Sequence, residues 1–122
     1  MSMDTGAAAC ILVVEDEWLI GDLIEDILSE AGFRVCGPAG SVEQALLLLK
    51  NKTIDAAILD INLGTERSFP IAERLKEQGT PFMFMTGYTA SEVPEEFSGS
   101  PIMSKPLAPV HLITAVQQLL HR

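Results

Sequence analysis

The stretch Cys10-Ile-Leu-Val-Val-Glu-Asp-Glu17 decides the fold, because five apolar residues run directly into three acidic ones. A continuous apolar run of this length, rich in β-branched residues, is typical of a strand buried on both faces of a parallel sheet. After it, apolar side chains recur at intervals of three and four up to Ala31, which predicts an amphipathic helix that ends at Gly32. A buried strand followed by a helix is the repeating unit of an α/β fold.

The same alternation continues along the rest of the chain. Further strands are predicted at 33–36, 54–59, 81–85 and 101–103, and further helices at 41–51, 69–78 and 108–120. Residues 90–100 favour only a short helix, because Pro94 and Gly99 interrupt a segment with few apolar positions. Strict alternation of apolar strands and helices favours parallel pairing with right-handed crossovers. We therefore predict a doubly wound five-stranded parallel sheet with helices on both faces, in the flavodoxin-like order 2-1-3-4-5.

The composition limits the class of protein. The 122 residues include 8 basic and 17 acidic side chains, for a formal net charge of −9, and 48% of them are hydrophobic. These values suit one folded domain, which we place at 10–122 after an N-terminal tail of residues 1–9. The acidity argues against direct nucleic-acid binding, and the lack of a long apolar run or signal peptide predicts a cytoplasmic protein without a membrane span. Cys10 and Cys36 lack metal-site spacing and are expected to be small buried hydrophobes without a disulfide.

Polar side chains follow four of the five predicted strands. The first strand is followed by Glu15 and Asp16, the third by Asp60, the fourth by Thr86 and the fifth, closely, by Lys105. Because the carboxyl ends of parallel strands share one edge of the sheet, these side chains can converge there. Three carboxylates without histidine or cysteine select a hard cation such as Mg²⁺. With a lysine and a hydroxyl, such a site would stabilise a phosphoryl group in transfer, and Asp60 is the best candidate to accept it as an acyl phosphate.

Each of these residues also has a plainer interpretation when it is taken alone. Glu15 and Asp16 suit a helix N-terminus, where negative charge is favoured, and Asp60 suits a turn. Thr86 alone fits a loop hydroxyl, and Lys105 alone fits a solvated surface charge. Only their coincidence at four strand ends favours a site.

In this combination the sequence resembles a response-regulator receiver domain of two-component signalling, over about residues 10–121. The matching pieces occur in the family's order, and they are Ile11-Leu-Val-Val-Glu-Asp-Glu17, Ile58-Leu-Asp60, Thr86 and Ser104-Lys105-Pro106. The resemblance implies that Asp60 is the phospho-acceptor and that Thr86 and Lys105 contact the phosphoryl oxygens. It also implies that the Lys105-Pro106 bond is cis.

The resemblance further implies a magnesium site and protein partners. Asp16 and Asp60 would ligate Mg²⁺ together with the backbone carbonyl of Asn62, and Glu15 would act largely through water. The phosphoryl group would come from a histidine kinase or a histidine phosphotransfer protein, and the phosphorylated chain would act on a downstream protein target. Such a protein is no enzyme beyond its own phosphorylation and slow autodephosphorylation.

Within the family, Pro81-Phe-Met-Phe-Met-Thr-Gly-Tyr88 resembles the motif Pro-Phe-x-Phe-Ala-Thr-Gly-Tyr of a subgroup of stand-alone receivers, with Met85 in place of alanine. Two positions depart from the wider family. Ile102 stands where the family has an aromatic switch residue, and Gly64 stands where it has a loop proline. We therefore hypothesise that phosphorylation orders residues 87–99 in place of the usual aromatic switch.

Two other functions remain open on sequence alone. A Mg²⁺-dependent aspartyl-phosphate phosphatase has a similar strand end but requires an Asp-x-Asp pattern, whereas this chain has Asp60-Ile-Asn62. A flavodoxin-like binding module would carry flavin, and a coloured purified protein would reveal it. The sequence leaves open the cognate kinase, the downstream target, the lifetime of the phosphoryl group, the oligomeric state and whether the chain belongs to a longer protein.

Overall fold

A five-stranded parallel sheet forms the centre of the molecule in the computed structural model, which describes residues 8–87, 93–105 and 108–121. Its strands are β1 (Cys10–Val14), β2 (Arg34–Ala39), β3 (Ala56–Asp60), β6 (Phe82–Thr86) and β7 (Ile102–Ser104). They are arranged in the order β2-β1-β3-β6-β7, and every neighbouring pair is parallel. This is the predicted 2-1-3-4-5 order, with β2 and β7 at the edges, so the predicted fold is confirmed.

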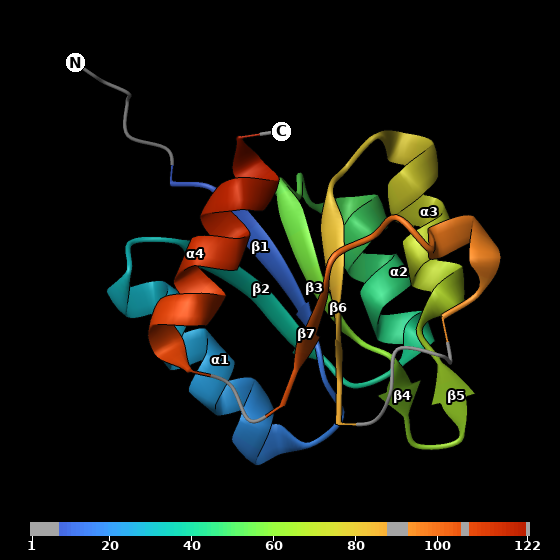
Figure 1. Cartoon of the computed structure of the whole chain (residues 1–122), viewed down its shortest axis with the longest axis horizontal. Coiled ribbons are helices and arrows are strands. Elements are labelled where there is room, and N and C mark those ends of the chain that lie inside the picture. The colour runs from blue at the N-terminus through green and yellow to red at the C-terminus, as the bar shows by residue number, and fades with distance from the viewer. Residues whose placement is uncertain (1–7, 88–92, 106–107, 122) are drawn as a thin grey trace.

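Helices cover both faces of this sheet. They are α1 (Trp18–Glu30), α2 (Val42–Asn51), α3 (Phe69–Gln78) and α4 (Pro109–Leu120). Figure 1 shows α1 and α4 together on one side of the sheet and α2 and α3 together on the other. Within the described residues, none of these helices has the length and apolar character needed to cross a membrane.

The core consists of two apolar layers, one on each face of the sheet. Successive side chains of β1 point to opposite faces, so Leu12 and Val14 join the layer under α2 and α3, while Ile11 and Val13 join the layer under α1 and α4. All residues of β1, β3 and β6 are buried. The continuous apolar runs of the sequence therefore correspond to the three central strands, as expected for a sheet covered on both faces.

Three of the helix ends follow local sequence signals. Ser41 Oγ accepts a hydrogen bond of 3.1 Å from the amide of Gln44 at the start of α2, and Gln44 Oε1 accepts one of 2.8 Å from the amide of Gly40. Gly32, just after α1, and Gly79, just after α3, adopt left-handed φ angles of +96° and +75°. These interactions satisfy polar backbone groups that a helix leaves unpaired at its ends.

The second strand is longer than predicted. The pair Gly37-Pro38 was expected to close it after Cys36, but β2 continues to Ala39, which pairs with Val14 after a shift in register. Gly37 allows this path because it adopts φ +101°, where a Cβ would lie only 2.7 Å from the carbonyl oxygen of Val13. Pairing with β1 therefore overrides the local turn signal.

Two connecting segments also have structure that periodicity does not reveal. The segment after Asp60, where residues 62–65 were expected as a loop, forms an antiparallel hairpin of β4 (Asn62–Leu63) and β5 (Glu66–Arg67). Gly64 occupies its two-residue turn with φ +65°, a conformation that glycine adopts without strain. In the stretch 90–100, the described residues form a 3₁₀ turn, η2 (Glu95–Phe97), in agreement with the expectation of a short helix.

The burial of the two cysteines leads us to expect that the protein loses stability at alkaline pH. Cys10 and Cys36 are buried free thiols whose Sγ atoms lie 2.8 Å apart, and burial together with this contact raises the pKa of Cys10 to about 11 from an ordinary 9.0. The unfolded chain therefore loses this proton at lower pH than the folded protein. We expect the free energy of unfolding to fall by about 2 kcal/mol from this group as the pH rises from about 9 to about 11.

Urea unfolding at several alkaline pH values measures this loss. Cys10→Ala lacks the titrating thiol, so its stability is expected to fall less over the same pH range than that of the wild type. Lysines also titrate there, but they are common to both proteins and cancel in the comparison. Equal losses in the two proteins would contradict the prediction.

Candidate functional site

A polar pocket of about 410 Å³ lies at the carboxyl ends of the central strands. The residues that line it come from four separate connections of the chain, and they are Asp16, Glu17, Asp60, Asn62, Gly64, Gly87 and Lys105. The hairpin β4–β5, at the lower edge of the molecule in Figure 1, follows directly after β3 at this edge. Parallel strands place their ends together in this way, which is why residues distant in sequence meet.

Lys105 joins the carboxylates of this pocket. Its Nζ atom lies 2.8 Å from Glu15 Oε1 and 3.0 Å from Asp60 Oδ2. The contact with Asp60 is a hydrogen bond, whereas that with Glu15 Oε1 is an ion pair without hydrogen-bond alignment. The backbone amide of Lys105 donates to the carbonyl of Thr86 at 3.0 Å, so pairing between the ends of β6 and β7 brings the lysine to the pocket.

The buried charged side chains of this pocket shift one another's pKa values. Burial raises the pKa of Glu15 to about 7, against the opposing effect of the Lys105 ammonium and of the Glu17 amide, which donates to Glu15 Oε2 at 3.1 Å. Burial alone would lower the pKa of Lys105, but the Glu15 and Asp60 carboxylates hold it above its ordinary value. Lys105 therefore stays cationic at neutral pH, and its charge offsets the repulsion between the two buried acids.

Asp60 is the last residue of β3 and is 5% exposed. Its two carboxylate oxygens have different partners, because Oδ2 accepts from Lys105 and Oδ1 accepts from the backbone amide of Asn62 at 3.3 Å. A buried central strand and these two hydrogen bonds together restrict the orientation of the carboxylate. Such a group is well suited to act as a nucleophile from a defined position.

Three carboxylates lie close enough to share a metal ion. Ligand oxygens from Glu15, Asp16 and Asp60 all lie within 4.8 Å of one another. Opposite ligands of an octahedral Mg²⁺ lie about 4 Å apart, so small movements of these side chains would suffice to surround one ion. Asp16 is exposed and Asn62 also lines the pocket, which leaves room for water ligands. The oxygen-only donor set fits a hard cation.

The structure thus brings the predicted site residues to one edge of the sheet. Glu15, Asp16, Asp60 and Lys105 lie around the pocket, and Asn62 lines it. The sixth residue, Thr86, is 1% exposed at the end of β6. Their chemical roles stay predictions at this stage. Pro106 of the expected cis bond and residues 88–92 of the hypothesised switch segment lie outside the described residues.

Three further residues line the pocket. Glu17 and Gly64 were not predicted as part of the site, and the sequence left Gly87 open between a turn residue and a small residue that gives the phosphodonor access to Asp60. Glu17 is a third carboxylate near Lys105, 3.8 Å from its Nζ atom, although its side chain is 66% exposed. Its place in the acidic run Glu15-Asp-Glu17 was the available signal. Gly64 and Gly87 line the opening, where small residues leave space above the carboxylates.

Comparison with known proteins agrees with this geometry. Residues 11–117 match the family described as the response regulator receiver domain. The chain belongs to this family. The receiver is 28% identical over 93% of its length to the transcriptional regulatory protein YvrH of Bacillus subtilis (strain 168) and spans about half of that relative's length. The chain also spans about half the length of three further curated relatives.

Solved structures resemble the receiver over nearly its whole length. SdrG from Sphingomonas melonis Fr1 is 38% identical with a TM-score of 0.81, over 93% of this chain and 97% of that one. A structure of the BeF3-activated conformation of SdrG, from Pseudomonas melonis Fr1, is 39% identical with a TM-score of 0.79, over 94% and 98% of the two chains. A CheY-like receiver domain protein from Methanospirillum hungatei JF-1 has a TM-score of 0.85 at 25% identity, over 94% and 95%.

Proposed function

We propose that this receiver accepts a phosphoryl group on Asp60 from a phosphohistidine, and that phosphorylation changes its contacts with other proteins. The observation that carries the proposal is the position of Lys105, whose Nζ lies 3.0 Å from Asp60 Oδ2 beside two further carboxylates. A lone carboxylate at a turn needs no such group around it. The existence of a BeF3-activated conformation of the similar SdrG also supports a phosphorylation-dependent state.

The transfer uses groups that the chain already holds in place. An oxygen of the Asp60 carboxylate attacks phosphorus, and a new P–O bond forms as the P–N bond to the histidine breaks. The electron pair of that bond stays with the ring nitrogen, which leaves as neutral imidazole when its other nitrogen carries a proton. Lys105 lies beside the attacking carboxylate and is positioned to contact an oxygen of the phosphoryl group, where charge is concentrated in the transition state.

Mg²⁺ would be held by Asp16 and Asp60, with the carbonyl of Asn62 as a third ligand and Glu15 acting through water. When bound, the ion supplies positive charge that neutralises the carboxylates and the phosphoryl oxygens. Glu15 is buried against Lys105, which suits an indirect role for this carboxylate. Asp16 is exposed at the mouth of the pocket and suits direct ligation.

We also propose that the catalytic ability of the chain stops at its own phosphorylation and slow autodephosphorylation. Rapid hydrolysis of an acyl phosphate needs a general base that activates water. Position 62, two residues after Asp60, carries an asparagine, and an amide cannot take up a proton at neutral pH. This residue therefore favours an acceptor over a phosphatase that turns over a small substrate.

The proposed partners are a histidine kinase or histidine phosphotransfer protein and a downstream protein target, in the cytoplasm. The first helix offers a contact surface for the phosphodonor protein beside the pocket. Trp18 and Leu19, which follow the acidic residues of the pocket, are 71% and 66% exposed. Exposed apolar side chains in such a cluster are characteristic of protein–protein contacts.

The direct test is the intact mass of the protein after incubation with acetyl phosphate and Mg²⁺. We expect a gain of one phosphoryl group that is lost again on standing, because acyl phosphates hydrolyse. A chain that gains no phosphoryl group under these conditions, while folded and saturated with Mg²⁺, would contradict the proposed function. Steady release of phosphate from a small phosphomonoester would instead indicate a phosphatase.

Binding of Mg²⁺ is expected to change the fluorescence of the only tryptophan. Trp18 lies two residues beyond Asp16, so charge neutralisation at the pocket changes the electrostatic field at its indole ring. A titration into the millimolar range should give a saturable change that chelation by EDTA reverses. Asp16→Asn should weaken the response, whereas Asp26→Asn, an exposed change on α1, the helix that begins at Trp18, should leave it intact. A flat titration of the wild type would contradict a metal site here.

A further inference from the structure

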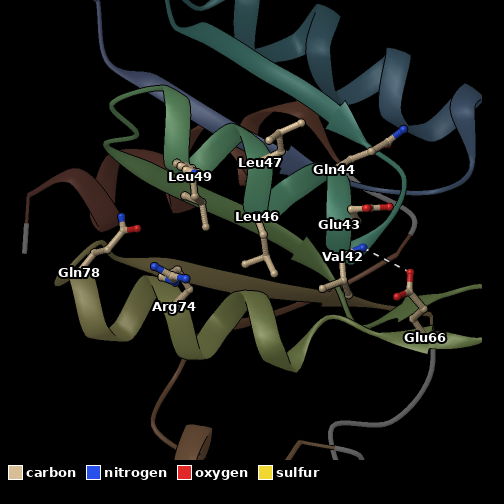
Figure 2. Close-up of a pocket in the computed structure, with 10 residues that line it drawn as sticks. Val42, Glu43, Gln44, Leu46, Leu47, Leu49, Glu66, Arg74 and Gln78 are labelled. Atoms are coloured by element: carbon tan, nitrogen blue, oxygen red, sulfur yellow. Dashed lines mark hydrogen bonds between the residues drawn. The ribbon is translucent and has the colours of Figure 1, made fainter.

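The face of the molecule formed by α2 and α3 carries a groove that the proposed function does not use. It encloses about 930 Å³ and lies on the side of the sheet opposite α1 and α4 (Figures 1 and 2). Its lining includes Val42, Glu43, Leu46, Leu47, Lys50 and Arg74. None of these residues lines the polar pocket around Asp60, so the groove is separate from the site of phosphorylation.

Helix α2 also carries an apolar side chain on the side that points away from the core. Leu49 is 7% exposed and packs under the helix, whereas Leu47 is 58% exposed and Leu46 is half-buried. In Figure 2, Leu46 extends toward α3 and Leu47 points to the other side of the helix. A helix that needs only the sheet as its partner requires one apolar stripe, so the exposed Leu47 lies outside that stripe, whereas Leu46 packs against the core.

Charged residues flank Leu46 and Leu47 in a symmetric way. Glu43, Leu47 and Lys50 follow one another at intervals of four and three residues, which places them on one face of the helix, and Leu46 lies at the edge of that face toward α3. Glu43 and Lys50 are equally far from the midpoint between the two leucines. The surface of α2 is therefore acidic at Glu43 and basic at Lys50, and these two residues are equally far along the helix from the pair Leu46 and Leu47.

The surrounding groove repeats this polarity. Glu66 lies at the acidic end, where its Oε2 accepts a hydrogen bond of 3.3 Å from the amide of Val42, drawn as the dashed line in Figure 2. Arg74 of α3 lies toward the other end, with its side chain 58% exposed. The groove thus carries two acidic and two basic side chains and no net charge, in a chain whose net charge is −9.

We propose that this groove binds a second copy of the same chain, with the two α2 helices packed antiparallel about a two-fold axis. Such an axis, placed between Leu46 and Leu47, brings Glu43 of each copy opposite Lys50 of the other and joins the leucines at the centre. A two-fold interface requires a surface that is complementary to itself, and this arrangement of charges meets that requirement. The geometry corresponds to a short antiparallel pair of helices with a leucine centre.

The charge balance argues for a second copy over other partners. Copies of a chain with a net charge of −9 repel one another at most contacts, but they do not at a neutral patch with opposite charges aligned. A strongly basic partner would gain more from the acidic remainder of the surface. Because α2 has ten residues, about 15 Å of helix, the buried area is below that of a standard stable interface, and the dimer is weak and reversible.

Sedimentation equilibrium of the full chain, from about 10 μM to about 1 mM, measures this association. The weight-average mass is expected to rise from 13.2 kDa toward twice that value as the concentration increases. Leu47→Glu, an exposed position whose change leaves the core intact, should abolish the rise. A mass that stays at the monomer value across the whole range would overturn the proposal.

Charge reversal tests the geometry as well as the association. Glu43→Lys and Lys50→Glu each place two pairs of like charges across the two-fold axis, and each should weaken association by about tenfold. The combined variant restores opposite charges with the polarity exchanged, so it should associate within about threefold of the wild type.

Glu43→Lys is the decisive variant because it makes the chain less acidic. If general repulsion between the acidic chains governed association, Glu43→Lys would strengthen it. Glu30→Lys on α1 is the matched control, because it changes the net charge equally, and it should strengthen association slightly or not at all. Circular dichroism confirms that each variant is folded. Dimers that form equally well with either single reversal, or double reversal that fails to restore association, would place the contact elsewhere and overturn the proposal.

Discussion

Asp60→Asn is expected to abolish phosphorylation by acetyl phosphate and by a phosphohistidine donor, in the presence of saturating Mg²⁺. The amide nitrogen of asparagine is not a nucleophile at neutral pH, so an acyl phosphate cannot form at this position. The side-chain carbonyl can still accept one of the two hydrogen bonds that the Asp60 carboxylate accepts, from Lys105 or from the Asn62 amide, and the size of the side chain is unchanged. The fold is therefore expected to survive.

Intact mass spectrometry after timed incubation gives the result directly. Asp22→Asn, an exposed change on α1 that removes the same charge, serves as the matched control and should be phosphorylated like the wild type. Labelling of Asp60→Asn to the extent of the wild type would show that another residue is the acceptor. Peptide mapping would then identify whether the label lies on Asp16 or Glu17, which also line the pocket.

Lys105→Met is expected to lower the rate of phosphorylation by a factor of about 10² to 10³, which is the range observed when one preorganised donor to a transition-state oxyanion is removed. The ammonium lies 3.0 Å from Asp60 Oδ2 and is held there by a second carboxylate, Glu15. The cation is thus placed before the reaction begins, which is the condition for a large electrostatic effect. Lys52→Met, an exposed change at the end of α2, is the matched control.

A second measurement separates a role in transfer from a role in metal binding. Lys105 contacts the same carboxylates that would bind Mg²⁺, so its removal eliminates a competing cation. The Trp18 fluorescence response to Mg²⁺ should therefore be retained by Lys105→Met at equal or lower metal concentration, while the transfer rate falls. Parallel loss of both responses would indicate that the lysine acts by maintaining the pocket and not on the phosphoryl group.

The fold was predictable because burial leaves a local pattern in the sequence. The first strand occupies Cys10–Val14 as predicted, since a strand covered on both faces is apolar at every position. The second strand was predicted too short, because Gly37-Pro38 is a turn signal and only pairing with β1 overrides it. The hairpin after Asp60 was missed for a related reason, since its strands have two residues each and are too short to show alternation.

The candidate site was predictable to a similar extent. The rule that strand ends of a parallel sheet share one edge brought together Glu15, Asp60 and Lys105 without any knowledge of contacts. The rule does not specify which charges pair. That Lys105 bridges the two acids, and that Glu17 approaches it to 3.8 Å, depends on side-chain positions across three different connections.

The four consecutive leucines of α2 show most clearly what the local sequence determines and what tertiary packing decides. The sequence by itself determined that residues 41–51 form a helix, because helical periodicity and the Ser41 cap are properties of neighbouring residues. Only the tertiary structure decided that Leu49 faces the sheet and Leu47 faces solvent, because this depends on how the helix is rotated against strands distant in sequence. In the same way, the sequence determined which acids end the strands, and the packed sheet decided that Lys105 holds two of them together.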